Sequence, residues 1–154
     1  MTTYYFYKNT KSKFLEISGQ DSISFIQNLI TNDINKSHEN HFLYSCLLTP
    51  QGKFIADFFI FKKKDKFIFE IHEKYYETLI KKFNLYKLKS KIIIKTIDSI
   101  YSFVIFDKIN PISKYAIFND DPRSSKIGKK LIQSNIISKN NNVSNNNIIS
   151  SNEN

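Results

Sequence analysis

Residues 54–61 form the most apolar run of the chain, and they constrain the fold more than any other feature. The run has the length of one strand. Before it, Thr49-Pro50-Gln51-Gly52 predicts a tight turn, because proline fixes φ at the second position and glycine accepts positive φ at the fourth. After it, the charged residues 62–65 predict a solvated hairpin tip. We therefore predict a central strand with antiparallel neighbours at 42–48 and 66–71.

Two helices are predicted by apolar side chains that recur at spacings of three and four residues. One covers about 22–31 and follows Asp21, which stands where an N-cap carboxylate can accept free backbone N–H groups. The other covers 73–87. Further strands are predicted at 4–8, 13–18, 91–97, 101–106 and, from a weaker pattern, 115–118.

The order strand, helix, two or three strands, helix, strand is that of the split βαβ or ferredoxin-like arrangement. In it, the helices cover one face of an antiparallel sheet, so we expect an α+β domain over residues 1–108. Residues 109–137 have a thin hydrophobic pattern and are expected to begin a second, truncated subdomain. Residues 138–154 hold eight asparagines and four serines, so we expect a disordered tail that cannot build a core.

Composition excludes several classes of protein. With 41% hydrophobic and 15% aromatic residues, the chain can form a sizeable core, which excludes a fully disordered protein. No apolar run approaches the roughly 18–20 residues that span a bilayer, and residues 1–13 lack the features of a secretory signal. We therefore expect a cytoplasmic protein without a membrane partner. The single cysteine excludes an internal disulfide and a cysteine-cluster metal site.

The formal net charge of +9 is the kind of footprint that a nucleic-acid binder shows. However, lysine is enriched together with Asn, Ile, Phe and Tyr, which indicates compositional drift and a solvated lysine-rich surface. Arg123 is the only arginine, whereas bidentate recognition of phosphates and bases prefers arginine. Direct nucleic-acid binding is therefore not expected. A lysine-driven RNA-binding module that stacks bases on the aromatic run 4–7 stays as an alternative.

Asp57 places a carboxylate inside the apolar run, which costs free energy unless the group is paired or faces a polar cavity. By alternation, Asp57 shares a face of the strand with Ile55, Phe59 and Phe61. One interpretation is that this face is solvated near the middle of the strand. The other is that the carboxylate lines a ligand pocket and accepts hydrogen bonds from an amine or a pterin-type N–H. The pattern favours neither.

Two more polar features are candidates for binding. Asn32-Asp33 follows the first predicted helix, where the commoner role of such a pair is a C-terminal turn. Asp121-Pro122-Arg123 holds the only arginine of a chain that otherwise uses lysine, which hints at a fork geometry that lysine cannot supply. The simpler interpretation is a turn with a surface arginine.

The histidines and the cysteine do not indicate a metal site or a nucleophile. His38 and His41 lie three residues apart in a polar loop, but zinc needs a third and a fourth ligand, and none is indicated. Cys46, in the middle of a predicted strand, is expected to be a small core residue. No neighbouring cation or helix N-terminus would activate its thiol. We therefore predict no catalytic residue and no metal ligand.

Four stretches of the sequence fit one family pattern in order and spacing: residues 15–34, 47–61, 86–92 and 121–131. Any one alone would be weak, but together they are specific. On these residues the chain resembles the folate-binding YgfZ family, a branch of the glycine-cleavage T-protein (aminomethyltransferase) superfamily. The Asp-Pro-Arg segment and Asp57 look closer to the mitochondrial and alphaproteobacterial iron–sulfur assembly branch than to the gammaproteobacterial one.

The resemblance implies a fold and a function. Family members have three small domains around a central channel that binds a folate derivative. They assist the assembly or repair of iron–sulfur proteins, particularly those with four-iron (4Fe-4S) clusters, and some are linked to tRNA modification. In T-protein relatives the aspartate that matches Asp57 contacts folate, so Asp57 is the first binding candidate. Asn32 and Asp33 come next, and Arg123 is a weaker fourth. The implied partners are folate and the iron–sulfur assembly machinery or its client proteins.

The chain departs from the family pattern in one respect. The family hallmark, Lys-Gly-Cys-Tyr-x-Gly-Gln-Glu, is absent, and Cys46 does not correspond to its cysteine. We therefore expect the N-terminal half of a family member, with a truncated T-protein-like fold. Folate binding is expected to be weak, because half a channel encloses less of a ligand. An accessory factor is expected rather than an enzyme, and a tetrahydrofolate-dependent aminomethyltransferase is the alternative.

Overall fold

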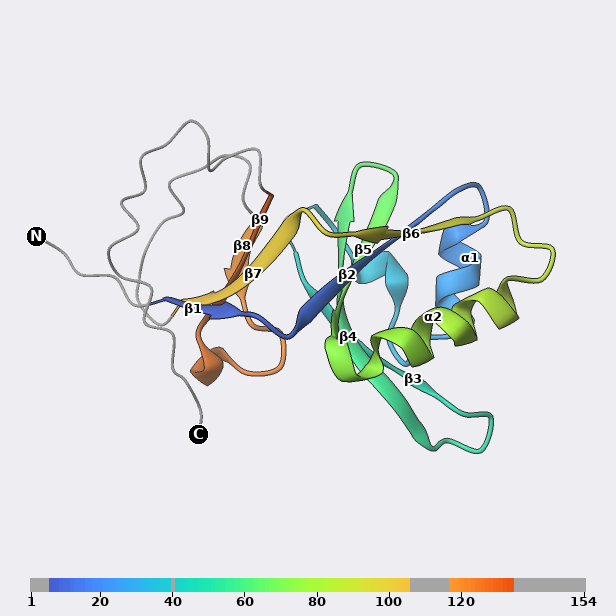
Figure 1. The fold of residues 1–154 in the computed structure, drawn as a ribbon, viewed down its shortest axis with the longest axis horizontal. Helices are drawn as coiled ribbons and strands as arrows, with labels where there is room; N and C mark the ends of the chain where they lie inside the picture. Colours follow the sequence, from blue (N-terminus) through green and yellow to red (C-terminus); the bar gives the residue numbers. More distant parts are fainter. Residues whose placement is uncertain (1–5, 40, 106–116, 135–154) are drawn as a thin grey trace, which may run out of the picture. The chain divides into compact units, whose positions relative to one another are not determined.

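The computed structural model describes residues 6–39, 41–105 and 117–134. Contacts divide the chain into two compact units (Figure 1). One is Lys11–Asp98, and the other combines Met1–Thr10 with Ser99–Asn154. Each unit contains an antiparallel sheet, and the two α-helices belong to the first unit. The expected mixed α and β class with antiparallel sheets is therefore confirmed.

The unit Lys11–Asp98 holds a five-stranded sheet in the order β3-β4-β5-β2-β6. Strands β5 and β6 both pair antiparallel with β2, which lies between them, so they run parallel to each other. Helix α2 makes the crossover between β5 and β6. The strands are β2 (Ser12–Ser18), β3 (Leu43–Leu48), β4 (Phe54–Lys63), β5 (Lys66–His72) and β6 (Ile93–Ile97), and the helices are α1 (Ser22–Gln27), the 3₁₀ helix Ile34–Lys36 and α2 (Glu73–Lys87).

The predicted meander is confirmed. β4 pairs with β3 on one side and with β5 on the other. The tight turn before β4 closes through a 2.9 Å hydrogen bond from the Gly52 N–H to the Thr49 carbonyl, and Gly52 has φ +79°. This positive φ explains the glycine at that position.

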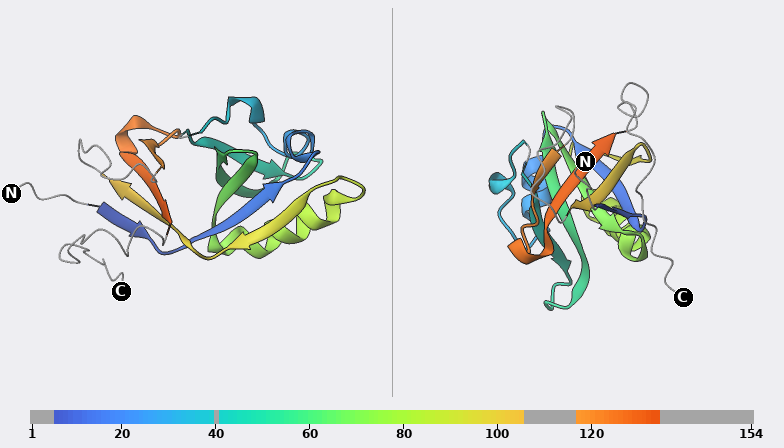
Figure 2. Two further views of the ribbon diagram at one scale, coloured as in Figure 1. Left: turned by 90° about the horizontal axis from the view of Figure 1, so that it is seen from above. Right: turned by 90° about the vertical axis from the view of Figure 1, so that its left-hand side faces the viewer.

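Both helices pack on one face of this sheet and share its core (Figure 2). Phe25 of α1 and Phe83 of α2 meet edge to face, with ring centroids 5.9 Å apart. From β4, Ala56, Phe58 and Ile60 enter the same core. The alternation predicted for β4 therefore holds from Ala56 onward.

The alternation fails at the start of β4 because the pairing register with β3 shifts between Leu47 and Leu48. Leu47 pairs with Ala56, but Leu48 pairs with Phe54, so Ile55 has no opposite residue. Ile55 packs against the helix-side core, and Phe54 is 52% exposed. Such an extra residue is a β-bulge, which alternation alone cannot reveal.

Helix α1 is shorter than the predicted span of about 22–31, because the following residues are held by β3. Ile30 forms a bridge with Leu47. The Thr31 N–H donates to the Cys46 carbonyl at 3.0 Å, and the Cys46 N–H donates to Thr31 Oγ1 at 3.0 Å. The residues after α1 are thereby fixed against β3, the strand that places Cys46 opposite Asp57.

Asp21 occupies the N-cap position of α1, but its carboxylate does not cap the helix. Instead, Asp21 Oδ2 accepts a 2.7 Å hydrogen bond from the Lys91 N–H. Gly19, with φ +115°, lies so close to Lys91 that a Cβ atom would collide with its carbonyl oxygen. The start of α1 and the segment before β6 are therefore joined directly.

The second unit contains a four-stranded antiparallel sheet in the order β1-β7-β9-β8 (Figure 1). Strand β9 was not predicted, since its sequence begins with two lysines, and Lys130 is buried. The strands are β1 (Phe6–Asn9), β7 (Ile100–Ile105), β8 (Ile117–Asp120) and β9 (Lys129–Ser134), with a 3₁₀ helix at Ser125–Ile127.

The contacts place residues 1–10 and 99–108 in one unit with later residues, whereas the sequence predicted a boundary at residue 108. The reason is that β7 pairs with both β1 and β9. That residues 1–108 form a domain of their own stays a prediction. The expected tail at 138–154, and the parts of the expected subdomain at 109–116 and 135–137, lie outside the described residues. Within the described ranges, no helix is long and apolar enough to cross a membrane.

Candidate functional site

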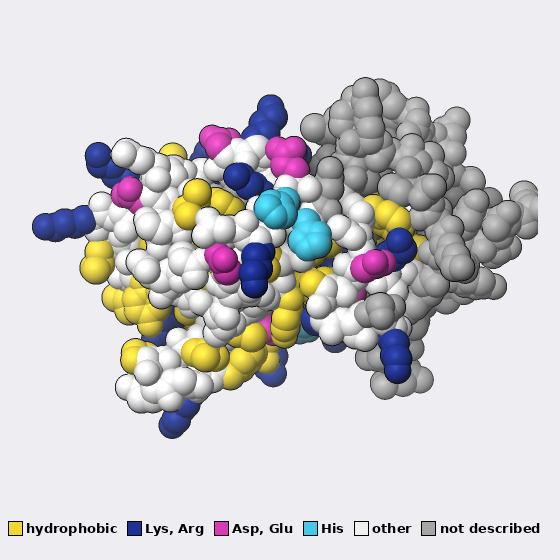
Figure 3. All heavy atoms as spheres, turned by 180° about the vertical axis from the view of Figure 1, so that it is seen from behind, with side chains coloured by type: hydrophobic (Ala, Val, Ile, Leu, Met, Phe, Trp, Pro, Cys, Tyr) yellow, Lys and Arg dark blue, Asp and Glu magenta, His cyan; other side chains and the backbone are white. Residues whose placement is uncertain are grey.

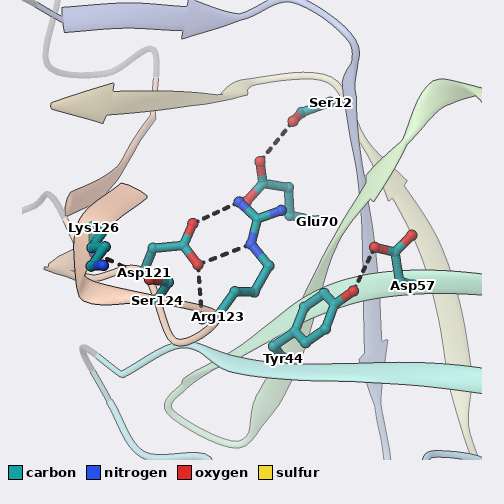
Figure 4. Close-up of polar contacts among 8 residues, drawn as sticks. All are labelled: Ser12, Tyr44, Asp57, Glu70, Asp121, Arg123, Ser124 and Lys126. Atoms are coloured by element: carbon teal, nitrogen blue, oxygen red, sulfur yellow. Dashed lines mark hydrogen bonds and ion pairs between the residues drawn. The ribbon is translucent and has the colours of Figure 1, made fainter. Parts of the chain in front are cut away.

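Asp57 lies on the face of β4 that is turned away from the helices, and β3 places Cys46 directly opposite it. The Tyr44 hydroxyl donates a 2.8 Å hydrogen bond to Asp57 Oδ2 (Figure 4). The carboxylate is half-buried. Among the described residues, Tyr44 is its one hydrogen-bond donor, so Oδ1 can still accept from a ligand.

Aromatic side chains of β4 lie on the same face as Asp57. The Tyr44 ring lies 5.4 Å from the Phe59 ring, and Phe42 and Phe61 meet edge to face at 5.8 Å. Phe59 and Phe61 are buried, at 8% and 1% exposure. This face is therefore not uniformly solvated, because it carries a half-buried carboxylate and buried aromatic rings.

Asn32 is joined to the same group of residues. Its Nδ2 donates to the Tyr44 carbonyl at 2.9 Å, and its Oδ1 accepts from the Asp33 N–H at 2.8 Å. The structure thus brings two of the predicted site residues, Asn32 and Asp57, into one network through Tyr44. We call Asn32, Tyr44, Cys46 and Asp57 the Asp57 network.

Asp33 has a local structural role. Its side chain caps the 3₁₀ helix Ile34–Lys36, with Oδ1 accepting from both the backbone N–H and the Nδ2 of Asn35 at 3.0 Å. The sequence favoured a turn at the C-terminus of the first helix for Asn32-Asp33, but Asp33 instead caps the N-terminus of the next, 3₁₀ helix. Its carboxylate is half-buried and directed to its own turn.

Cys46 is half-buried and lies outside the helix-side core, so the expectation of a core cysteine is wrong. Burial and the negative charge of Asp57 raise the pKa of the Cys46 thiol, against the lowering effect of hydrogen bonds with Tyr44 and Thr31. The thiol therefore stays protonated at neutral pH, which makes it a poor nucleophile.

Tyr44 and Cys46 were not recognised from the sequence as neighbours of Asp57. Antiparallel pairing of β3 with β4 was predicted, and it brings some residue of β3 opposite Asp57. The bulge decides which one. Continuing the Leu48–Phe54 pairing without the shift would place Ser45, not Cys46, opposite Asp57.

Arg123 belongs to the other unit, where its guanidinium binds Asp121 (Figure 4). Nη2 lies 2.7 Å from Oδ2, Nε donates to Oδ1 at 2.9 Å, and the Arg123 N–H also donates to Oδ1 at 2.9 Å. Burial would raise the pKa of Asp121, but the hydrogen bonds and charge of Arg123, together with Lys130, hold that pKa below its usual range. The fork geometry expected of Arg123 is used within its own turn.

The histidines are not gathered into a site. His38 and His41 are exposed, with ring centroids 6.5 Å apart. His72 is the N-cap of α2, where its Nδ1 accepts from the Lys74 N–H at 3.1 Å. In the part of the chain that the structure describes, no three His, Cys, Asp or Glu side chains are arranged to hold a metal ion.

Comparison with known proteins gives two groups of relatives, while no protein-family model matches the chain. The chain is 34% identical over 98 residues to the mitochondrial iron-sulfur cluster assembly factor IBA57 homolog of Neurospora crassa, covering 59% of this chain and 22% of that protein. It is 28% identical over 127 residues to an aminomethyltransferase of Alkaliphilus metalliredigens, covering 79% and 30%. The chain is therefore homologous to both groups, but it spans less than a third of the length of these two relatives.

One solved structure has a similar fold. The glycine cleavage system aminomethyltransferase T from Bartonella henselae superposes with a TM-score of 0.66 over 84% of this chain and 41% of that chain. The sequence identity is 7%, so this likeness shows the fold alone. The fold is therefore similar to that of the aminomethyltransferases.

Proposed function

We propose that this chain is a folate-binding-type module that assists the assembly or repair of iron–sulfur proteins, particularly those with four-iron clusters. Similarity to a protein named as an iron-sulfur cluster assembly factor supports the process. Similarity to aminomethyltransferases supports the folate-related ancestry. Its partners would be folate and the iron–sulfur assembly machinery or client proteins.

The observation that carries the proposal is the Asp57 carboxylate, whose Oδ2 is held by Tyr44 while Oδ1 can accept a further donor. A pterin ring presents N–H groups at its edge, and a half-buried carboxylate is a strong acceptor for them. The half-buried ring of Tyr44, which packs against the buried Phe59 ring, offers apolar surface to the flat pterin. The residues present therefore fit a folate, whose pterin Asp57 would orient and whose bound one-carbon group would be the reactive part.

The remaining site residues have graded roles in this proposal. Asn32 fixes the backbone of Tyr44 and so positions Asp57 indirectly. Asp33 shapes the adjoining turn. Arg123 stays a weaker candidate, because its guanidinium already binds Asp121.

Several finer assignments belong to the same proposal. We infer that the chain corresponds to the N-terminal half of a YgfZ-type protein and acts as an accessory factor rather than as an enzyme. The sheet order and the α2 crossover support a ferredoxin-like arrangement with β3 as an added edge strand. A cytoplasmic location stays a prediction, and the Neurospora crassa relative is named as mitochondrial.

Two alternatives are open to direct tests. Aminomethyl transfer is favoured by the 127-residue similarity to an aminomethyltransferase, and an assay with an aminomethyl-carrier protein would detect it. RNA binding rests on the net charge of +9 and on the aromatic run 4–7, of which residues 4 and 5 lie outside the described residues.

The proposal is tested by titrating tetrahydrofolate and, separately, tRNA at two salt concentrations into wild type, Asp57→Asn and the control Asp65→Asn. Asp65 is exposed at the β4–β5 tip, so its substitution removes one charge away from the network. We expect weak tetrahydrofolate binding in wild type and in Asp65→Asn, and none in Asp57→Asn. The proposal would be contradicted, and the RNA alternative supported, if tetrahydrofolate did not bind while tRNA bound with a strong salt dependence that Asp57→Asn did not change.

A further inference from the structure

Helix α2 ends in a turn that places a leucine where glycine is usually required. The Ser90 N–H donates to the Lys87 carbonyl at 2.8 Å, which closes a β-turn over Leu88 and Lys89. Leu88 has φ 42° and ψ −113°, close to the first central position of a type II′ turn. Glycine dominates that position, because an L side chain is strained at positive φ.

This strained leucine is also the most exposed large apolar side chain among the described residues, at 86%. Leu85, one helical turn earlier, is 62% exposed. An exposed leucine does not contribute to the core, so core packing does not account for a leucine at this strained position. A position that breaks a local rule without a structural gain is a candidate functional site.

A hollow of about 690 Å³ lies beside Leu88 and is lined by Asp21, Ser24, Leu88, Lys89 and Ser90. Its two walls are fixed to each other by the hydrogen bond from the Lys91 N–H to Asp21 Oδ2. We call Leu85 and the residues that line this hollow the Leu88 surface. It is a shallow, wide-open and partly apolar surface of the unit Lys11–Asp98.

Leu85, Leu88, Lys89 and Ser90 of the Leu88 surface lie within a strongly basic segment, and Asp21, whose carboxylate accepts from the Lys91 N–H, is the one acidic residue that lines the hollow. Residues 78–97 contain six lysines and no acidic residue. Among the described residues, these six lysines form no ion pair with an acidic side chain. Figure 3 shows lysine side chains projecting beside exposed hydrophobic ones at the end of the molecule drawn on its left.

We propose that the Leu88 surface docks an acidic segment of a partner protein, with an aliphatic side chain of that segment in the hollow. The basic segment supplies charge complementarity, and Leu85 and Leu88 supply the apolar contact. A second copy of this chain would bring lysines against lysines. RNA recognition would use arginine forks or aromatic stacking, whereas the exposed apolar side chains here are aliphatic. This inference does not depend on the proposed function.

The test measures the affinity of a fluorescent synthetic peptide of glutamates with a central pair of leucines. Leu88→Gly removes the side chain while giving the turn its preferred residue, so the unfolding midpoint should stay the same or rise. We expect the peptide to bind this variant about tenfold more weakly, which corresponds to loss of one buried leucine contact. Wild-type affinity in Leu88→Gly would overturn the proposal.

The charge contribution is tested with two variants of equal net charge. Lys89→Glu/Lys91→Glu changes the proposed surface, and Lys63→Glu/Lys64→Glu makes the same change at the exposed β4–β5 tip. We expect weaker peptide binding in the first variant alone. Equal weakening of peptide binding in both variants would show general electrostatic attraction and overturn the proposal. The same conclusion would follow if a single-stranded RNA of the same charge bound more tightly than the peptide and its affinity did not change in Leu88→Gly.

Discussion

The two aspartates that stand out in the sequence, Asp57 and Asp121, have opposite environments. Asp121 is buried, at 3% exposure, and both of its carboxylate oxygens accept from Arg123. Asp57 is half-buried, and its described partner is a neutral hydroxyl on one oxygen. Arg123, the only arginine, binds Asp121 within its own turn. The Asp57 carboxylate, by contrast, has an oxygen that can accept a further hydrogen bond.

This difference separates a structural carboxylate from one that is suited to bind a ligand. A buried charge with all its hydrogen bonds made stabilises a fold only with its partner in place. A partly exposed carboxylate with one neutral partner contributes little to stability, and it can meet a ligand without breaking internal bonds. Substitutions at the two sites should therefore affect different quantities.

The largest effect is expected for Arg123→Ala. It leaves the buried Asp121 carboxylate without its main partner, which should lower the free energy of unfolding by about 2 kcal/mol. The value is below that of a fully buried pair, because the Arg123 side chain is 37% exposed and solvent screens its charge. Chemical denaturation measures the loss. If the free energy of unfolding changes by less than about 0.5 kcal/mol, the Asp121 carboxylate contributes as little to stability as the Asp57 carboxylate is expected to, and the distinction is wrong.

The contribution of Asp121 to the pH dependence of stability should have opposite signs in wild type and in Arg123→Ala. In wild type its pKa is held below the unfolded value, so its stabilisation is present above the unfolded pKa of about 3.9 and is lost as the pH falls through the folded pKa. In Arg123→Ala, burial without the arginine disfavours the charged form of the Asp121 carboxylate. Protonation of that carboxylate at low pH therefore removes part of the destabilisation that the substitution causes. The stability difference between wild type and Arg123→Ala should narrow below about pH 4. A difference that widens there would contradict this account.

A small change in stability is expected for Asp57→Asn. The asparagine Oδ1 can still accept from the Tyr44 hydroxyl, so the free energy of unfolding should change by less than about 0.5 kcal/mol. Asp121→Asn is the matched control, since it makes the same replacement at a buried, charge-paired position and should destabilise clearly more. Equal losses in the two variants would remove the distinction between the sites.

The smallest effect concerns the reactivity of Cys46, which is the only thiol of the chain. The charge of Asp57 helps to raise the pKa of this thiol. Asp57→Asn should therefore increase the rate of alkylation by iodoacetamide near pH 8, by about twofold. Tyr44→Phe removes a hydrogen bond that lowers the pKa, so it should slow the reaction. Rate changes of the opposite signs would mean that Asp57 and Cys46 do not face each other.

Local signals predicted most of the larger unit. The turn at 49–52, the apolar run of β4 and the helical spacing of residues 73–87 each depend on neighbours in sequence, and all are present in the structure. Strand β9 was missed because Lys130 is buried, whereas a lysine in a short segment normally indicates solvent. Its burial depends on pairing with β7 and β8, which no local pattern reports.

The candidate site residues were selected from the sequence, but the contacts among them were not predicted. Asp57 and Asn32 could be selected from the sequence, yet their link through Tyr44 depends on the bulge at Leu47 and Leu48. In the same way, Asp21 was expected to cap α1, but the backbone of Lys91 comes within reach and takes its carboxylate. Such choices among several hydrogen-bond partners are made by tertiary packing.

The most direct test is the shift in the thermal unfolding midpoint that tetrahydrofolate causes in wild type, Asp57→Asn and Asp121→Asn. A ligand that binds the native state but not the unfolded chain raises this midpoint, and the rise grows with the logarithm of the ligand concentration divided by Kd. We predict a shift in wild type and in Asp121→Asn, even though the latter starts from a lower midpoint, and no shift in Asp57→Asn. A shift of wild-type size in Asp57→Asn would contradict the claim that Asp57 is the carboxylate available for a ligand.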